Sequence, residues 1–205
     1  TTASSGTAIG YQALFSNTTG DTNTAVGQWA LYDNTAGGSN VAVGRDALQN
    51  NTTADYNTAV GVGSSFTNTT GTENTSIGAF ASYYNTTGDF NVSVGKNALT
   101  SNTTASYNTA VGYQAGYTNT TGDGLTAIGF QSLLSNTTGT QNTAQGYKAL
   151  YANTTGSYNT GLGFQALLSN TTAPRNTAVG YQSLTANTTG DNNTAIGERS
   201  GASTT

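Results

Sequence analysis

One glycine recurs at every seventeenth position along this chain of 205 residues. It belongs to the motif N-T-A-V/I-G-x-x-A, written without change from Asn108 to Ala115. The twelve glycines of this series are Gly10, Gly27, Gly44, Gly61, Gly78, Gly95, Gly112, Gly129, Gly146, Gly163, Gly180 and Gly197. Because no unit contains an insertion or a deletion, we expect each repeat to be one structural unit that stacks on the unit before it.

The other positions of the repeat are constrained to different degrees. We number each repeat from the Asn of the motif, so that the invariant glycine is position 5. Position 1 is Asn in ten of the twelve units, and position 4 is Val, Ile or Leu everywhere except at Gln145. Position 8 is always Ala or Ser, and position 9 is Leu in eight units. In every complete unit, position 12 is Asn and position 15 is Gly or Ala, whereas positions 6, 7, 16 and 17 vary widely.

The charged residues indicate which positions face water. Five cations and nine carboxylates, together 7% of the chain, all fall at positions 6, 7, 11, 16 or 17. Because a charge is rarely buried without a partner, these positions face solvent. We therefore expect the aliphatic position 4, the small position 8 and the Leu at position 9 to face a narrow interior.

The repeat predicts an all-β fold. Thr-Ala-Val favours a short strand, and the glycine at position 5 ends it at a bend with positive φ. One coil per repeat gives a parallel β-solenoid of about twelve 17-residue coils, an extended rod formed by residues 1–205 as a single repeat array. The array begins and ends in the same repeat phase, and we expect it to be a fragment of a longer fibre. Positions 6 to 11 are ambiguous, so a solenoid with one short strand and one helical turn per repeat is the alternative.

A row of asparagines at position 12 allows two interpretations. Ten of them lie in N-x-T sequons: Asn17, Asn51, Asn68, Asn85, Asn102, Asn119, Asn136, Asn153, Asn170 and Asn187. They predict either a ladder of hydrogen-bonded amides from coil to coil or a line of N-glycans. The ladder is favoured, because glycans on every coil would crowd one another and because position 1 retains Asn mostly without a sequon.

Three rows of threonine at positions 2, 13 and 14 raise the question of ice binding by a flat hydroxyl array. The neighbouring pair at positions 13 and 14, for example Thr103 and Thr104, points to opposite faces if the chain is extended there. A two-residue array is therefore not expected at this corner, and ice binding is the weaker alternative.

Aspartates at position 16 recur in every second coil, at Asp21, Asp55, Asp89 and Asp123, with Asp191 in the same phase. One carboxylate for two coils is too sparse for calcium, which takes six to eight oxygen ligands. We expect the spacing to reduce like-charge repulsion instead.

Aromatic side chains at positions 6, 7 and 17 occupy the variable corners, at Tyr11, Trp29, Phe80, Tyr107, Tyr158, Phe164 and Tyr181. They could stack on sugars, form an adhesive face, or fill a seam between three chains. The sequence does not separate these possibilities.

The motif resembles that of a known family. N-V-A-V-G from Asn40 to Gly44 and N-V-S-V-G from Asn91 to Gly95 are similar to the head repeats of YadA-like trimeric autotransporter adhesins. The longer form N-T-A-V-G-Y-Q-A-L also resembles arrays in bacterial and phage tail-fibre proteins. The resemblance implies a β-roll, a homotrimer and a surface that adheres to host or matrix. The repeat of this chain is longer than that of the adhesin heads, and the additional residues fall around N-T-T.

We therefore expect a structural, non-enzymatic extracellular fibre segment, a stalk or adhesive head on a cell surface or a virion. A glycan- or ice-binding solenoid and a self-assembling filament are the alternatives. The expected partner is the chain itself, as homotrimer or filament, with cell-surface glycans or matrix as a further candidate. The net charge of −4 argues against nucleic acid, and no apolar run is long enough to insert into a membrane. The chain has no His and no Cys, which excludes Ser-His and Cys-His nucleophiles, and we expect neither a cofactor nor a metal.

Overall fold

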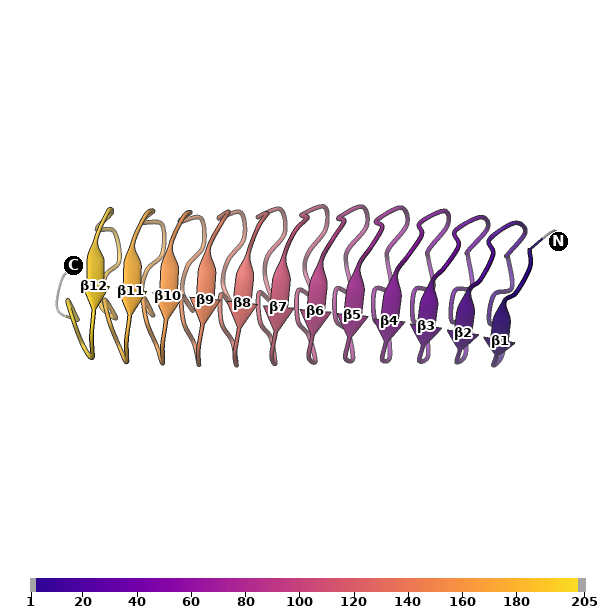
Figure 1. Ribbon diagram of the computed structural model, residues 1–205, viewed down its shortest axis with the longest axis horizontal. Helices are drawn as coiled ribbons and strands as arrows, with labels where there is room; N and C mark the ends of the chain where they lie inside the picture. Colours follow the sequence, from indigo (N-terminus) through magenta and orange to yellow (C-terminus); the bar gives the residue numbers. More distant parts are fainter. Residues whose placement is uncertain (1–2, 203–205) are drawn as a thin grey trace.

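Each Thr-Ala-Val segment forms a three-residue strand, and the strands stack into one parallel sheet that runs along the molecule (Figure 1). The computed structural model describes residues 3–202. The strands are β1 (Thr7–Ile9), β2 (Thr24–Val26), β3 (Val41–Val43), β4 (Thr58–Val60), β5 (Thr75–Ile77), β6 (Val92–Val94), β7 (Thr109–Val111), β8 (Thr126–Ile128), β9 (Thr143–Gln145), β10 (Thr160–Leu162), β11 (Thr177–Val179) and β12 (Thr194–Ile196).

Every strand pairs with the next one in the same register. Thr109 lies opposite Thr126, and Val111 lies opposite Ile128. The order β1 to β12 contains no crossover, so the chain advances by one strand at each turn. At about 4.8 Å per step, the eleven steps between twelve strands give a rod roughly 53 Å long. The predicted parallel β-solenoid is confirmed.

The alternative with a helical turn is wrong for the described residues 3–202, which contain no helix. Positions 6 to 11 form consecutive turns instead. Position 7 has a left-handed backbone, as at Gln114 with φ 54°, and so does position 9, as at Leu133 with φ 49°. Two left-handed residues in so short a segment are incompatible with a right-handed helix.

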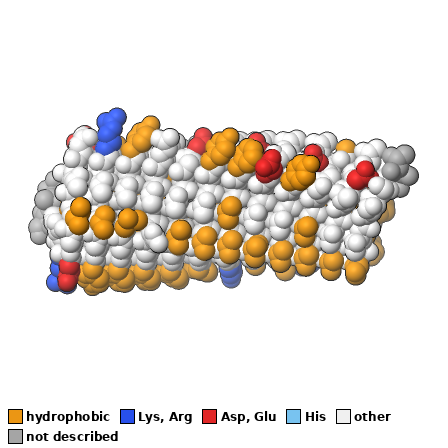
Figure 2. Space-filling view, viewed as in Figure 1, with side chains coloured by type: hydrophobic (Ala, Val, Ile, Leu, Met, Phe, Trp, Pro, Cys, Tyr) orange, Lys and Arg blue, Asp and Glu red, His pale blue; other side chains and the backbone are white. Residues whose placement is uncertain are grey.

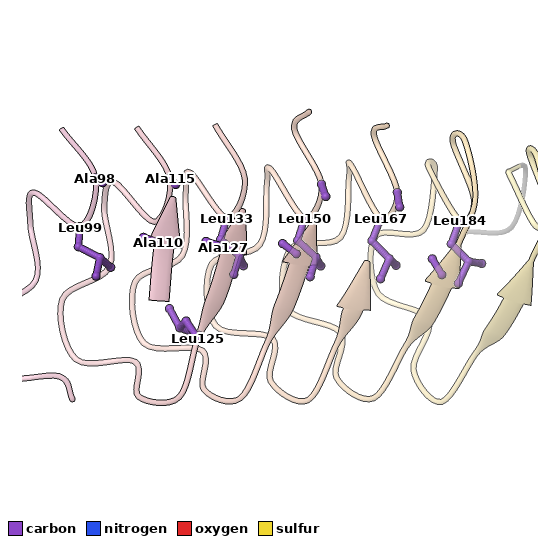
Figure 3. Close-up of a cluster of buried hydrophobic side chains, with 14 of the residues drawn as sticks. Ala98, Leu99, Ala110, Ala115, Leu125, Ala127, Leu133, Leu150, Leu167 and Leu184 are labelled. Atoms are coloured by element: carbon purple, nitrogen blue, oxygen red, sulfur yellow. The ribbon is translucent and has the colours of Figure 1, made fainter. Parts of the chain in front are cut away.

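The interior is narrow and is filled by small side chains with, in most coils, one leucine. Ala110, Ala115 and Leu133 are fully buried and represent positions 3, 8 and 9. Figure 3 shows the leucines of successive coils projecting into the interior one after another. Their packing in a continuous apolar cluster confirms the predicted burial of positions 8 and 9.

The predicted burial of position 4 is wrong. Ile9, Ile77 and Ile196 are 60%, 40% and 71% exposed, and the other aliphatic side chains of this row are partly exposed. The reason is the alternation of side chains along a strand. Since the alanine at position 3 points inward, positions 2 and 4 both point outward. This placement also accommodates Gln145, whose exposed polar side chain requires no exception to the core.

Candidate functional site

The asparagines at position 12 form a buried ladder of side-chain amides. Asn136 donates from Nδ2 to Oδ1 of Asn119 at 2.9 Å and to the carbonyl of Gly139 at 2.9 Å, and its Oδ1 accepts from Nδ2 of Asn153 at 2.8 Å. The same pattern links Asn34, Asn51, Asn68, Asn85, Asn102, Asn119, Asn153, Asn170 and Asn187 to the preceding coil.

At the sequon asparagines from Asn51 to Asn187, these contacts oppose attachment of a glycan in the folded chain. Nδ2 is the atom that carries an N-glycan, and in the ladder it already donates two hydrogen bonds. The sequon asparagines from Asn51 to Asn187 are at most 1% exposed. Attachment of a sugar to such an atom would disrupt this hydrogen bonding and force the corner open.

A second ladder runs along position 1, with different geometry. Oδ1 of Asn40 accepts from the backbone N–H of Asn57 at 2.9 Å, and Nδ2 of Asn40 donates to the carbonyl of Ala54 at 2.8 Å. Leu125 interrupts the row: its N–H still binds Oδ1 of Asn108, while Nδ2 of Asn108 is buried without a partner. Two rows of side-chain amides, at positions 12 and 1, therefore hold the corner of the chain on either side of position 15.

Left-handed residues occur at three positions of each coil. Every described residue at positions 7, 9 and 17 has positive φ, including leucines such as Leu99 and bulky side chains such as Phe90. This conformation is uncommon outside Gly, Asn and Asp. The residue type at position 9, mostly leucine, did not indicate a positive φ. Burial of the leucine side chain there offsets the cost of the backbone strain.

Four aspartates at position 16, Asp21, Asp55, Asp89 and Asp123, bind the backbone of the coil before them. Asp55 Oδ1 accepts from the N–H of Gly38, Asp89 Oδ1 from that of Thr72, and Asp123 Oδ1 from that of Ser106, at 2.6 to 2.7 Å. Ser157 plays the same part for Thr140 with its hydroxyl. The spacing of the aspartates in the sequence did not indicate this role. In the part of the chain that the structure describes, no three acidic residues lie close enough together to hold a metal ion.

The threonines at positions 13, 14 and 2 differ in their hydrogen bonds and in their exposure to solvent. At position 13 the hydroxyl donates to the carbonyl of the same position one coil ahead, as from Thr120 to Thr137 at 3.0 Å and from Thr137 to Thr154 at 3.1 Å. The expectation that positions 13 and 14 differ in direction fits their exposure, since Thr120 is partly buried and Thr121 is exposed. The threonines of position 2 lie on the outward face of the sheet beside position 4.

Five aromatic rings at position 6 form an exposed stack over coils 7 to 11. Tyr113, Phe130, Tyr147, Phe164 and Tyr181 have centroids 5.1 to 5.4 Å apart, and each is about 40% exposed. In Figure 2, hydrophobic side chains form a continuous row along the lower edge of the C-terminal part of the rod. Because neighbouring rings are within 18° of parallel, each face covers the next, and mainly ring edges are presented to solvent.

The other aromatics are dispersed. Tyr11 and Trp29 meet edge to face at the same edge, whereas Phe90 and Tyr107 stack at position 17 on the opposite edge. At position 10, Phe66 stacks on Tyr83, and burial raises the pKa of the Tyr83 hydroxyl, with Tyr84 and Asp46 adding to the shift.

The described residues form no pocket, and none of their segments forms a helix of the length and apolarity required to cross a membrane. No family model, curated protein or solved structure matches the chain. The molecule is a tandem-repeat parallel β-solenoid whose candidate functional features are repeated rows of side chains.

Proposed function

We propose that the chain is a structural segment of an extracellular fibre, acting as stalk or head of a surface adhesin or of a phage-type tail fibre. One observation supports this proposal above all others: the twelve strands keep a single register without interruption. Such a stack transmits length and stiffness along its axis, and a surface feature repeated on each coil can act multivalently.

We propose further that three copies associate along the aromatic stack of coils 7 to 11. Exposed apolar stripes of this kind are typical of association surfaces. Because the ring faces are covered by neighbouring rings, the stack is poorly suited to sugars, which bind to open faces. Ring edges from a second and a third copy can pack against it.

Sedimentation analysis of the chain tests this assembly. We expect a trimer for the unaltered chain and a monomer for the double variant Tyr147→Ser, Phe164→Ser. The double variant Phe90→Ser, Tyr107→Ser removes a stacked pair on the opposite edge and should leave the trimer intact. A chain that is monomeric at every concentration, or equal dissociation of both variants, would contradict the proposed seam. Larger end-to-end species would favour the filament instead.

A further inference from the structure

The outward face of the sheet carries two straight rows of side chains. Position 2 supplies Thr7, Thr24, Thr58, Thr75, Thr109, Thr126, Thr143, Thr160, Thr177 and Thr194, with Val41 and Val92 in the two remaining coils. Position 4 supplies Val, Ile or Leu, with one Gln. We call these two rows the sheet face. It lies apart from the aromatic stack, which is on the edge beyond position 5 (Figures 1 and 2).

The hydroxyls of the sheet face have no partner within the protein. Among the described residues, none of the ten position-2 hydroxyls makes a hydrogen bond to a protein atom, whereas position-13 hydroxyls such as those of Thr103 and Thr120 are bonded to the next coil. The position-2 side chains are partly or fully exposed. Water must therefore satisfy them, and it must do so at the interval of one coil.

The geometry of the sheet face is that of a regular lattice. Neighbouring threonines are about 4.8 Å apart along the rod, and positions 2 and 4 are about 6.6 Å apart across it. Positions 1 to 5 carry no charge in any coil, so no strongly hydrated group disturbs the water between the rows. Hydroxyls that anchor water, flanked by methyl groups around which water forms cages, would order the first hydration layer over the length of the sheet.

A protein partner fits this face less well than water does. A second chain laid over it would remove water from ten hydroxyls that the fold leaves unbonded, and each would then require a new partner at the same interval. An ice surface offers oxygen atoms in straight rows at a similar interval, and it needs neither charge nor a pocket. Crystalline water therefore complements both the hydroxyls and the methyl groups.

We infer that the sheet face binds ice. Its hydroxyls form a single row at position 2, and the aliphatic side chains of position 4 lie beside them, so that the face has the pattern Thr-x-Val in place of a two-residue hydroxyl array. The inference stands apart from the proposed fibre role, because a fibre segment need not bind ice and an ice-binding rod need not form a trimer.

Thermal hysteresis and inhibition of ice recrystallisation, measured on the purified chain with a seed ice crystal, test the inference. The unaltered chain should shape the crystal and depress its growth temperature. The double variant Thr109→Lys, Thr143→Lys places two long charged side chains on the sheet face, two coils apart, and should reduce both activities several-fold.

The control variant is Thr121→Lys, Thr155→Lys. It alters the same coils with the same substitution at the exposed position 14, and it should retain the activity of the unaltered chain. Circular dichroism shows whether both variants keep the fold. Absence of activity in the unaltered chain, or equal loss in both folded variants, would overturn the inference. So would a shift of the sheet-face variant alone to a smaller sedimenting species, because it would show that protein covers this face.

Discussion

At the scale of single residues, the invariant glycine is required by two independent features. Gly112 has a φ of +135°, which L side chains rarely adopt, and a Cβ built on it would lie 2.5 Å from the carbonyl oxygen of Gly129. The same geometry recurs from coil to coil, so one substitution disturbs both its own bend and the neighbouring coil. The strict recurrence of this glycine is thus a backbone requirement.

Replacement of Gly112 by alanine should lower the free energy of unfolding by about 3 kcal/mol or more, the sum of backbone strain and overpacking. Gly197→Ala is a matched control, since φ there is +119° but nothing lies within 4 Å of the added carbon. Gly197→Ala should lower the free energy of unfolding only by the cost of the backbone strain. Urea unfolding followed by circular dichroism measures both. Equal costs would mean that the close approach between coils does not matter.

Sequence reasoning at this scale identified the glycine but not the left-handed residues. A glycine on a strict period indicates positive φ directly. Leu99 and Leu133 gave no such signal, because leucine at a constant position indicates burial and is silent about backbone conformation. Likewise, the positions of the charged residues identified parts of the repeat that face solvent, but they did not show in which direction the side chain of Val111 points. The row of Val111 carries no charge and yet faces outward.

At the scale of the element, the asparagine ladder joins each coil to the next. Each position-12 amide from Asn17 to Asn170 both donates and accepts, so a break affects two coils. A typical net contribution of a hydrogen bond is about 1 kcal/mol, but leaving a buried group unpaired costs about 1 to 3 kcal/mol. The regular Asn at position 12 made the ladder predictable. The role of position 15 was not predictable: its backbone carbonyl accepts hydrogen bonds from the side-chain amides of positions 1 and 12.

Asn136→Asp should be strongly destabilising at neutral pH and much less so in acid. The carboxylate has no N–H for Asn119 or Gly139 and would be buried without a compensating charge, which costs about 3 to 5 kcal/mol. Burial raises the pKa of such a carboxyl in the folded state. The penalty is therefore absent below the unfolded-state pKa, develops as pH rises through it, and is complete above the folded-state pKa.

Unfolding curves recorded across this pH range, relative to the unaltered chain, check the prediction. Asn192→Asp is the control, because Asn192 is exposed and its change should stay within about 0.5 kcal/mol at every pH. A pH-independent loss in Asn136→Asp would argue for a steric effect in place of a buried charge.

At the scale of the whole molecule, the period determines the architecture and leaves the use of the surface open. An unbroken repeat of this length is too short for paired helices and suffices for one coil of a solenoid, which is why the rod could be predicted. The side chains of the outward-facing rows could not be predicted. A three-residue strand presents either its middle residue or its two flanking residues to the core, and the alternation of side chains is compatible with both arrangements. The fit of Ala110 in the narrow interior decides between them.

Buried amide ladders hold the stacked coils together, and exchange of side-chain amide hydrogens, measured by nuclear magnetic resonance, tests this role most directly. The Nδ2 hydrogens of ladder residues such as Asn102 and Asn136 should exchange orders of magnitude more slowly than those of the exposed Asn192 in the same sample. Exchange of all these side-chain amides at the rate of Asn192 would contradict the account.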